Sequence, residues 1–322
     1  MTKKIGKKYV VGVDGGGTKT IAALADLNGK ILKLTKTGPS NLRNVGIKKA
    51  AENIALAIKK VLPKKGKILS TFIGLAAVEE EYKFKIPKIK KELKKHKEIS
   101  KIFERKIEIN SDQKVAFRAG ADEDGVALNA GTGCVAHGWK RLQPIRHPPA
   151  SRTPKEAHAS GWGWLGDEGG AFFVGQKVFQ VILKDLDGRG SKTLLTKFIF
   201  KKLKLKSEED FLNIVYQKNP IEILPRFSIF CNEASKKRDK VAKEILIEAA
   251  KEAGLTAKAV IKKLNFQKEE FPLVLVGGMF KSKIFFKTVK IEIKKFAPKA
   301  KFILLKRKPV IGAVELAIEN LK

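Results

Sequence analysis

Short apolar runs alternate along the chain with longer segments whose apolar residues recur at helical spacing. The runs are rich in β-branched residues and mostly end in glycine, asparagine or aspartate, which is typical of buried strands. They cover residues 9–13, 20–25, 31–34, 71–75, 106–109, 126–129, 134–139, 271–276 and 301–305. The helical segments cover 47–61, 83–102, 113–119, 172–186, 211–216, 229–264 with a break near Gly254, 282–296 and 312–321. This alternation predicts an α/β fold. Residues 141–160 are proline-rich and lack periodicity, so we expect an exposed loop there.

The first apolar run leads into a carboxylate and a glycine turn. Asp14 is followed by Gly15, Gly16 and Gly17, then by Thr18 and Lys19, and a second strand pattern begins at once. Glycines leave backbone N–H groups open to a bulky anion, so this hairpin predicts a phosphate site, with Asp14 placed to hold a hydrated metal ion. An ordinary glycine-rich β-turn is the alternative. The segment is neither a Rossmann fingerprint, because no helix follows, nor a Walker A loop.

A second hairpin of the same kind lies about 115 residues further along the chain. The strand at 126–129 runs into Ala130-Gly131-Thr132-Gly133, and another strand follows. The recurrence indicates a duplicated α/β unit. We therefore expect a first lobe over residues 1–117 and a second lobe over 118–322, meeting at a cleft.

A glycine-rich segment at 161–170 combines Trp162 and Trp164 with Asp167 and Glu168. Aromatic faces and carboxylates together suit a sugar, whose ring packs on an aromatic side chain and whose hydroxyls bind carboxylates. Packing of the tryptophans in the core is the alternative.

The chain carries a net charge of +34, from 67 Lys and Arg residues against 33 Asp and Glu residues. Nucleic-acid binding would call for a localised patch with arginines and aromatic residues, whereas these cations are mostly lysine and are spread over many segments. We interpret them as a solvated surface that also attracts anionic ligands. The two cysteines, Cys134 and Cys231, fit no metal or redox spacing, and no apolar run is long enough for a membrane span. A cytoplasmic protein is expected.

Taken together, these motifs resemble the sugar kinase, Hsp70 and actin superfamily. Gly15-Gly16-Gly17-Thr18-Lys19-Thr20, the 128–133 hairpin and the 161–169 segment are similar to the N-acetylglucosamine kinase branch, which is grouped with the BadF/BadG/BcrA/BcrD ATPases. The resemblance implies a two-lobed, duplicated ribonuclease H-like (actin-like ATPase) fold. It also implies an ATP-dependent kinase for the primary hydroxyl of N-acetylglucosamine or a related amino sugar or hexose. A homodimer joined through the second lobe is expected, without membrane or nucleic-acid partners.

The same resemblance assigns roles to individual residues. Asp112 would be the catalytic base and would contact the sugar, and Asp14 would contact Mg²⁺ through water. ATP would be held by Gly15, Gly16, Gly17, Thr18, Lys19, Thr132, Gly133, Gly277 and Gly278. The sugar would be held by Asn41, Gly161, Trp162, Gly163 and Asp167. The chain departs from the family pattern at Gln113, where a small residue is usual, at Cys134, where serine is common, and at Ala76-Ala77, near the sugar.

Three alternatives stay open at this point. Asp112 precedes a helix and could be only its N-cap. The ATPase could drive electron transfer through an iron–sulfur cluster shared by two subunits, although this needs two suitably placed thiolates. A nucleotide-dependent nucleic-acid-binding or regulatory protein without kinase activity is the third.

Overall fold

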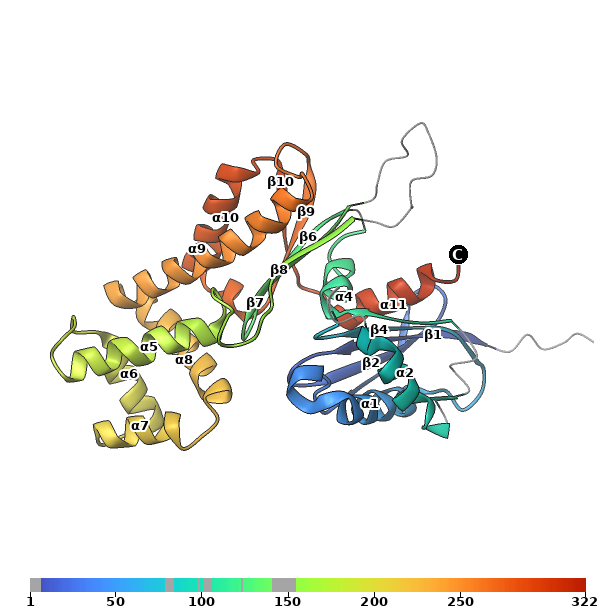
Figure 1. The fold of residues 1–322 in the computed structure, drawn as a ribbon, viewed down its shortest axis with the longest axis horizontal. Coiled ribbons are helices and arrows are strands. Elements are labelled where there is room, and N and C mark those ends of the chain that lie inside the picture. The colour runs from blue at the N-terminus through green and yellow to red at the C-terminus, as the bar shows by residue number, and fades with distance from the viewer. Residues whose placement is uncertain (1–6, 79–83, 98, 101–105, 123, 141–154) are drawn as a thin grey trace, which may run out of the picture. The chain divides into compact units, whose positions relative to one another are not determined.

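The computed structural model describes residues 7–78, 84–97, 99–100, 106–122, 124–140 and 155–322. The chain divides into two compact units (Figure 1). The first contains residues 1–122 together with Leu305–Lys322, and the second contains Glu123–Leu304. The first division therefore falls close to the expected boundary at residue 117. The last segment differs from the expectation, because it belongs to the first unit and not to the 118–322 lobe.

The first unit is built on a five-stranded sheet with the order β3-β2-β1-β4-β5. Its strands are β1 (Lys8–Gly15), β2 (Thr20–Ala25), β3 (Ile31–Thr37), β4 (Lys67–Leu75) and β5 (Lys106–Ser111). Strands β1, β4 and β5 run parallel, while β2 is antiparallel to both β1 and β3. The glycine turn thus joins the antiparallel pair β1 and β2, as the sequence predicts.

Helices cover both faces of this sheet. Helix α1 (Leu42–Val61) and helix α2 (Ile86–Lys94) share a core with Val11 and Val13 of β1. Helix α11 (Pro309–Glu319) packs on the other face, against Val10. The side chains of alternate residues of β1 thus pack into the cores on opposite faces of the sheet, because successive side chains of a strand point to opposite faces.

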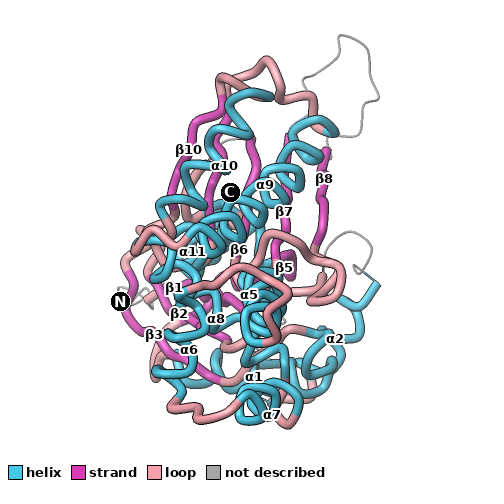
Figure 2. The backbone as a smooth tube through the Cα atoms, turned by 90° about the vertical axis from the view of Figure 1, so that its left-hand side faces the viewer, coloured by secondary structure: helices cyan, strands magenta, loops and turns pink. Residues whose placement is uncertain are grey.

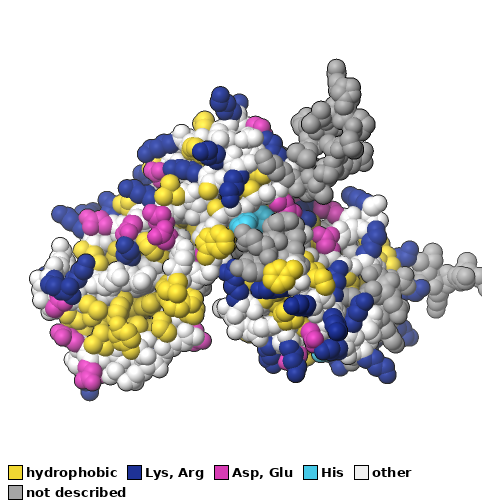
Figure 3. All heavy atoms as spheres, in the orientation of Figure 1, with side chains coloured by type: hydrophobic (Ala, Val, Ile, Leu, Met, Phe, Trp, Pro, Cys, Tyr) yellow, Lys and Arg dark blue, Asp and Glu magenta, His cyan; other side chains and the backbone are white. Residues whose placement is uncertain are grey.

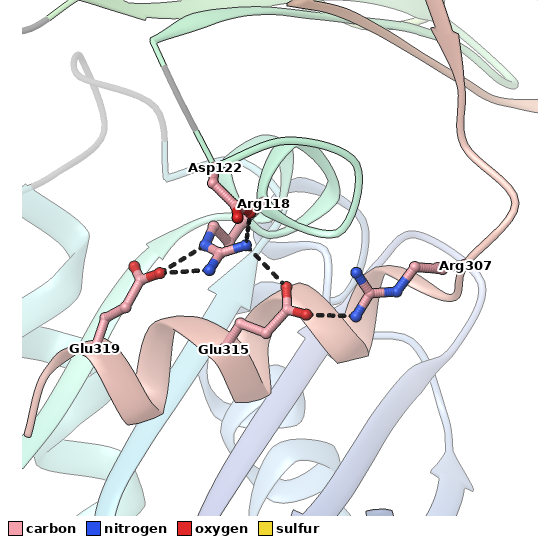
Figure 4. Close-up of polar contacts among 5 residues, drawn as sticks. All are labelled: Arg118, Asp122, Arg307, Glu315 and Glu319. Carbon is pink, nitrogen blue, oxygen red and sulfur yellow. Dashed lines mark hydrogen bonds and ion pairs between the residues drawn. The ribbon is translucent and has the colours of Figure 1, made fainter. Parts of the chain in front are cut away.

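Helix α4 (Asp112–Arg118) and α11 pack against each other and are joined by an ion-pair network (Figure 4). Arg118 Nε donates to Glu319 Oε1 at 2.7 Å, and Arg118 Nη1 donates to Glu315 Oε2 at 3.1 Å and to Asp122. Glu315 also accepts a hydrogen bond from Arg307. The network ties the return of the C-terminal segment to α4.

The second unit repeats the strand order of the first. Its sheet has the order β10-β9-β6-β7-β8. The strands are β6 (Gly125–Ala130), β7 (Cys134–Lys140), β8 (Lys155–Ser160), β9 (Phe271–Val276) and β10 (Ala300–Leu304). Pairings are antiparallel for β6–β7 and β7–β8, and parallel for β6–β9 and β9–β10. Each strand has a counterpart in the first sheet, with the same neighbours and directions, so the predicted duplication is confirmed.

Helices make up the rest of the second unit, and α9 lies against one face of its sheet (Figure 2). They are α5 (Ala171–Leu186), α6 (Leu194–Leu203), α7 (Glu208–Tyr216), α8 (Pro220–Lys236), α9 (Lys240–Lys263) and α10 (Lys283–Phe296). None of the helices in the described ranges is both long enough and apolar enough to cross a membrane.

Three elements of this unit differ from the sequence prediction. The expected loop over 141–160 ends in strand β8, while residues 141–154 lie outside the described part of the chain. The expected helix over 229–264 is two helices, and they separate at residues 237–239, not at Gly254. Helix α6 was given no bounds of its own, although the sequence from 171 to 264 is mainly helical in character.

Candidate active site

The carboxyl ends of three parallel strands bring two predicted site residues to one edge of the first sheet. In the register of β1, β4 and β5, Asp14 is level with Gly74, and Gly74 with Asn110. Asp112 directly follows Ser111, the last residue of β5. Since β4 lies between β1 and β5, the backbones carrying the two aspartates are roughly 10 Å apart. Ligands of open α/β sheets bind at this kind of edge.

The glycine turn between β1 and β2 is open to solvent at its tip. Gly16 N donates to Lys19 O at 3.0 Å, and Gly17, Thr18 and Lys19 are exposed. A Cβ on Gly16 or Gly17 would meet only ordinary contacts, at 3.5 and 3.8 Å, and neither residue has a positive φ. Neither packing nor backbone conformation requires these two glycines. The space beside their backbone can therefore admit a ligand such as a phosphate.

The loop that contains Asn41 is pinned to this hairpin. Thr20 Oγ1 donates to Gly38 O at 2.7 Å and shares a hydrogen bond with Ser40 Oγ at 2.8 Å. Ser40 N donates to Gly16 O at 3.0 Å, and a Cβ on Gly15 would lie only 2.6 Å from Ser40 Oγ. The predicted phosphate hairpin and the predicted sugar loop are thus one structure. Ser40, which was not singled out from the sequence, is the buried residue that joins them.

Asn41 also has a structural task. Its Oδ1 accepts a hydrogen bond from Arg43 N at 2.9 Å, which caps the first turn of α1. The cap fixes the side chain beside the hairpin. Its role toward a sugar stays a prediction.

Asp14 is electrostatically unusual. Burial raises the pKa of Asp14 from 3.8 to about 6, and the nearby Lys19 opposes this rise only in part. A half-buried carboxylate with a raised pKa is stabilised by an added cation, because the cation favours the charged form. Asp14 thus fits the role of a group that holds a hydrated metal ion.

Asp112 is the first residue of α4 and is not its N-cap. The cap is Ser111, whose Oγ accepts a hydrogen bond from Gln113 N at 3.0 Å. The capping interpretation of Asp112 is therefore wrong. The start of α4 packs closely against β4: a Cβ on Gly74 would lie 3.4 Å from the Cα of Asp112. Asp112 is left at the sheet edge with a side chain that the cap does not use.

The second hairpin is the meeting point of three segments of the second unit. Gly131 N donates to Gly133 O at 3.0 Å, and the start of α5 returns to the turn through Phe172 N, which donates to Thr132 O at 2.9 Å. Gly277 follows β9 with a φ of 108°, and a Cβ there would lie 2.7 Å from Gly131 N. The predicted ATP residues Thr132, Gly133, Gly277 and Gly278 thus lie around one turn.

A cradle of backbone N–H groups holds Asp167. Its Oδ1 accepts hydrogen bonds from Gly163 N and from Ser160 Oγ, both at 3.2 Å. Gly161 and Gly163 have positive φ values of 83° and 111°, which glycine adopts without strain. Burial raises the pKa of Asp167, and these hydrogen bonds act against the rise. The sugar-binding segment predicted from the sequence is therefore a folded loop that centres on Asp167.

The two tryptophans of this loop are not core residues. Trp162 is 59% exposed and Trp164 is 42% exposed. Trp162 makes an edge contact with His158 of β8, at 6.3 Å between ring centroids. The core-packing interpretation is wrong for both tryptophans.

The predicted residues fall into two groups, one in each unit. The first unit holds Asp14, Gly15, Gly16, Gly17, Thr18, Lys19, Asn41 and Asp112. The second unit holds Thr132, Gly133, Gly161, Trp162, Gly163, Asp167, Gly277 and Gly278. Cys134 belongs to neither group, because it faces the α9 side of the sheet and is buried in the core.

Two like sheets, each with a glycine hairpin between its first two strands, define a duplicated α/β fold that sugar kinases share. The crystal structure of a protein from Chromobacterium violaceum, provisionally described as an N-acetylglucosamine kinase, matches with a TM-score of 0.67 at 20% identity. The match covers 96% of this chain and 98% of that one.

The chain belongs to the BadF/BadG/BcrA/BcrD ATPase family, whose model matches residues 11–317. An N-acetylmuramic acid/N-acetylglucosamine kinase from Clostridium acetobutylicum is 32% identical, over 96% of this chain and 98% of the relative. An N-acetyl-D-glucosamine kinase from Dictyostelium discoideum is 30% identical, over 98% and 99%. The resemblance to this family that the sequence motifs indicate is confirmed.

Proposed function

We propose that the protein is an ATP-dependent sugar kinase that phosphorylates the primary hydroxyl of N-acetylglucosamine or a related amino sugar. The observation that carries the proposal is the shared sheet edge of Asp14 and Asp112, beside an open glycine turn. The candidate base, the candidate metal-binding carboxylate and the glycine turn proposed to bind phosphate all belong to the first unit, which supports the proposal. The two curated relatives, both named as N-acetylglucosamine kinases, support the substrate class.

In this proposal Asp112 is the general base. Its carboxylate accepts the proton of the sugar hydroxyl as that oxygen attacks the γ-phosphorus of ATP. The bond between the γ-phosphorus and the bridging oxygen breaks, and ADP leaves. Because phosphoryl transfer needs mainly positioning and charge stabilisation, one oriented carboxylate is enough on the protein side.

Mg²⁺ fits the surroundings of Asp14, whose carboxylate would hold the ion through water. A bound ion of this kind neutralises charge on the phosphates. Lys19, exposed at the tip of the turn, adds a positive charge on the same side. The N–H groups of Gly15, Gly16 and Gly17, with the hydroxyl of Thr18, would bind the phosphates.

The second unit contributes the other ligand contacts in this proposal. Thr132 and Gly133 would bind phosphate, and Gly277 and Gly278 would line the adenosine site. Asp167, fixed by the 160–163 loop, would accept hydrogen bonds from sugar hydroxyls, with Trp162 against the ring. Asn41 of the first unit would bind further hydroxyls. We also propose that the protein is cytoplasmic and that it forms a homodimer. Light scattering of the purified protein would test the homodimer.

The structure gives no support to the two other functions considered. Cys134 and Cys231 are both buried, and burial raises the pKa of each thiol, to about 12 for Cys134. Such thiols resist ionisation, whereas a cluster ligand must be a thiolate. Lys and Arg side chains are scattered over the visible face of each unit rather than gathered in one patch (Figure 3).

A sugar panel with coupled ADP detection tests the proposal. It covers N-acetylglucosamine, glucosamine, glucose, N-acetylmannosamine and N-acetylmuramic acid, with Mg²⁺ and ATP. We expect turnover to be highest with an N-acetylated sugar. No sugar-dependent ADP from any of them, by a folded protein that binds ATP, would overturn the proposal.

A further inference from the structure

Gln113 follows the proposed base, Asp112, in the sequence and is almost completely buried. The residue is 4% exposed, and its Nε2 donates a hydrogen bond to Asp112 Oδ1 at 3.1 Å. The backbone of Gln113 is fixed as well, since its N–H is capped by Ser111 Oγ. The amide therefore reaches the carboxylate from a rigid first turn of α4.

The carbonyl end of the same amide is in a less favourable environment. Gln113 Oε1 is buried and accepts no hydrogen bond from any residue that the structure describes. A buried carbonyl without a partner destabilises the fold, and a long side chain loses rotamer freedom when it is buried. An apolar side chain of the same length would fill this space without the penalty of the unpaired carbonyl. Packing alone therefore does not account for an amide at this position.

We infer that Gln113 is a positioning residue that holds the Asp112 carboxylate in one orientation for proton transfer. The inference rests on the proposed function, because it gives Gln113 a task only if Asp112 is the base. A carboxylate is free to rotate about its Cβ–Cγ bond, and a donor on one oxygen restricts that rotation. The oxygen that accepts the proton then keeps the geometry that general-base catalysis requires.

The substitution Gln113→Met separates positioning from packing. Methionine keeps the length and the approximate volume but removes both the donor and the unpaired carbonyl. Positioning predicts that kcat falls roughly 10-fold, that the KM for ATP stays within about twofold, and that the melting temperature is unchanged or higher. Packing predicts a lower melting temperature and unchanged kcat.

Gln217→Met is a matched control. Gln217 donates a similar side-chain hydrogen bond, to Asn213 Oδ1 at 2.9 Å, but it is an exposed residue that caps the C-terminal end of α7, far along the chain from every predicted site residue. The same substitution there should leave kcat and both KM values unchanged.

The decisive measurement repeats Gln113→Met in an Asp112→Asn background. If Gln113 acts through Asp112, the second substitution changes the residual kcat by less than about twofold, because the group that it orients is already gone. An equal loss in both backgrounds, or a single variant with wild-type kcat, would overturn the inference while the proposed function stands. A wild-type protein that is inactive on every sugar would instead overturn the proposed function, and the inference with it.

Discussion

Gly133 lies so close to the carboxylate of Asp167 that any side chain at position 133 would occupy the space of the Oδ2 oxygen. A Cβ there would also lie 3.3 Å from Asp167 Cγ. The turn predicted to bind phosphate and the carboxylate predicted to bind sugar are therefore in direct contact within the second unit. A change in one must displace the other.

The substitution Gly133→Ala tests this contact. We expect the added methyl group to push Asp167 out of its cradle and to weaken its hydrogen bonds with Gly163 N and Ser160 Oγ. If the proposed roles hold, the KM values for ATP and for the sugar both rise, and kcat/KM falls roughly 10-fold or more. Steady-state kinetics with each substrate varied in turn would measure this.

Gly131→Ala is the control for that experiment, because a Cβ at position 131 meets only Asn129 Oδ1, at 3.4 Å. This variant should retain nearly normal kinetics. Equal kinetics for the two variants would show that the contact between Gly133 and Asp167 has no functional weight.

The pH dependence of stability should report on Asp14. Its pKa is raised from 3.8 to about 6, so the folded protein binds this proton more tightly than the unfolded chain does. Ionisation of Asp14 therefore destabilises the fold progressively as the pH rises from about 4 to 6, by roughly 1–3 kcal/mol in total. Asp14→Asn removes this effect.

Without nucleotide, the Asp14→Asn variant should melt higher than the wild type at about pH 8 and equally at about pH 4. The variant should also bind Mg²⁺ and ATP less tightly, if Asp14 holds the ion. Thermal melts at several pH values provide the comparison. A melting-temperature difference that does not change with pH would contradict the raised pKa.

Arg118 should be important for stability rather than for chemistry. Its side chain is 17% exposed and pairs with Glu315 and Glu319 of α11 and with Asp122, which follows α4. Burial disfavours the charged guanidinium, but Glu319, Glu315 and Asp122 together outweigh this and raise the pKa of Arg118. Without Arg118, the mostly buried Glu315 keeps only its pair with Arg307, and Glu319 loses its ion pair with α4.

We expect Arg118→Met to lower the free energy of unfolding by about 2 kcal/mol. Arg189→Met is the matched control, because Arg189 pairs with Asp187 at the surface and is 70% exposed. Denaturant unfolding followed by circular dichroism should show a clear loss for the first variant and none for the second. Equal stability of the two would mean that α11 is held by its apolar contacts alone.

Local sequence signals were sufficient where one segment determines its own structure. The hairpin at 14–20 could be predicted because an apolar strand meets glycines and a second strand pattern. The missed strand β8 has alanines as its only apolar residues, so its alternation is a weak signal. It is the counterpart of β3 in the duplicated unit, so the repeat itself was the signal that would have revealed it.

Other features depend on contacts between distant segments, which one sequence does not display. Gly254 suggested a helix break, but it lies inside α9, where a Cβ would meet Glu292 of α10 at 3.1 Å. The real break follows Arg238, whose φ is 67°, and Asp239 then caps α9. Similarly, α11 packs closely against the end of α4 in the first unit because residue 312 is a glycine. A Cβ on Gly312 would lie only 2.5 Å from the backbone nitrogen of Ala119.

The candidate site shows the same division. Asp14, Asp112 and the two glycine turns could be identified from residue type and position at strand ends. Ser40 and Gln113 gained their roles only through the structure, because a buried hydroxyl or amide is recognised by its partners. Asp112 could not be distinguished from a helix cap until Ser111 was seen to fill that position.

The last prediction concerns Asp112 itself. Asn keeps the size of the side chain but cannot accept the proton, so Asp112→Asn should reduce kcat roughly 10²–10⁴-fold. ATP affinity should change little, because the proposed nucleotide contacts are made by other residues. Stability should also change little: Ser111 keeps the cap, and only the favourable position of an acidic group in the first turn of α4 is lost, at most about 1 kcal/mol.

Glu108→Gln provides the control, since Glu108 lies on the same strand as Ser111 and pairs with Lys114 at 3.7 Å. It should retain wild-type kcat, because a carboxylate inside β5 is further from the sheet edge than Asp112. Measurements of kcat, ATP affinity and melting temperature for the two variants complete the test. If Asp112→Asn keeps more than about a third of wild-type kcat on its best sugar, far above the range for loss of a general base, Asp112 is not the base. In that case another carboxylate must take the proton, and Asp167, with its raised pKa, is the next residue to substitute.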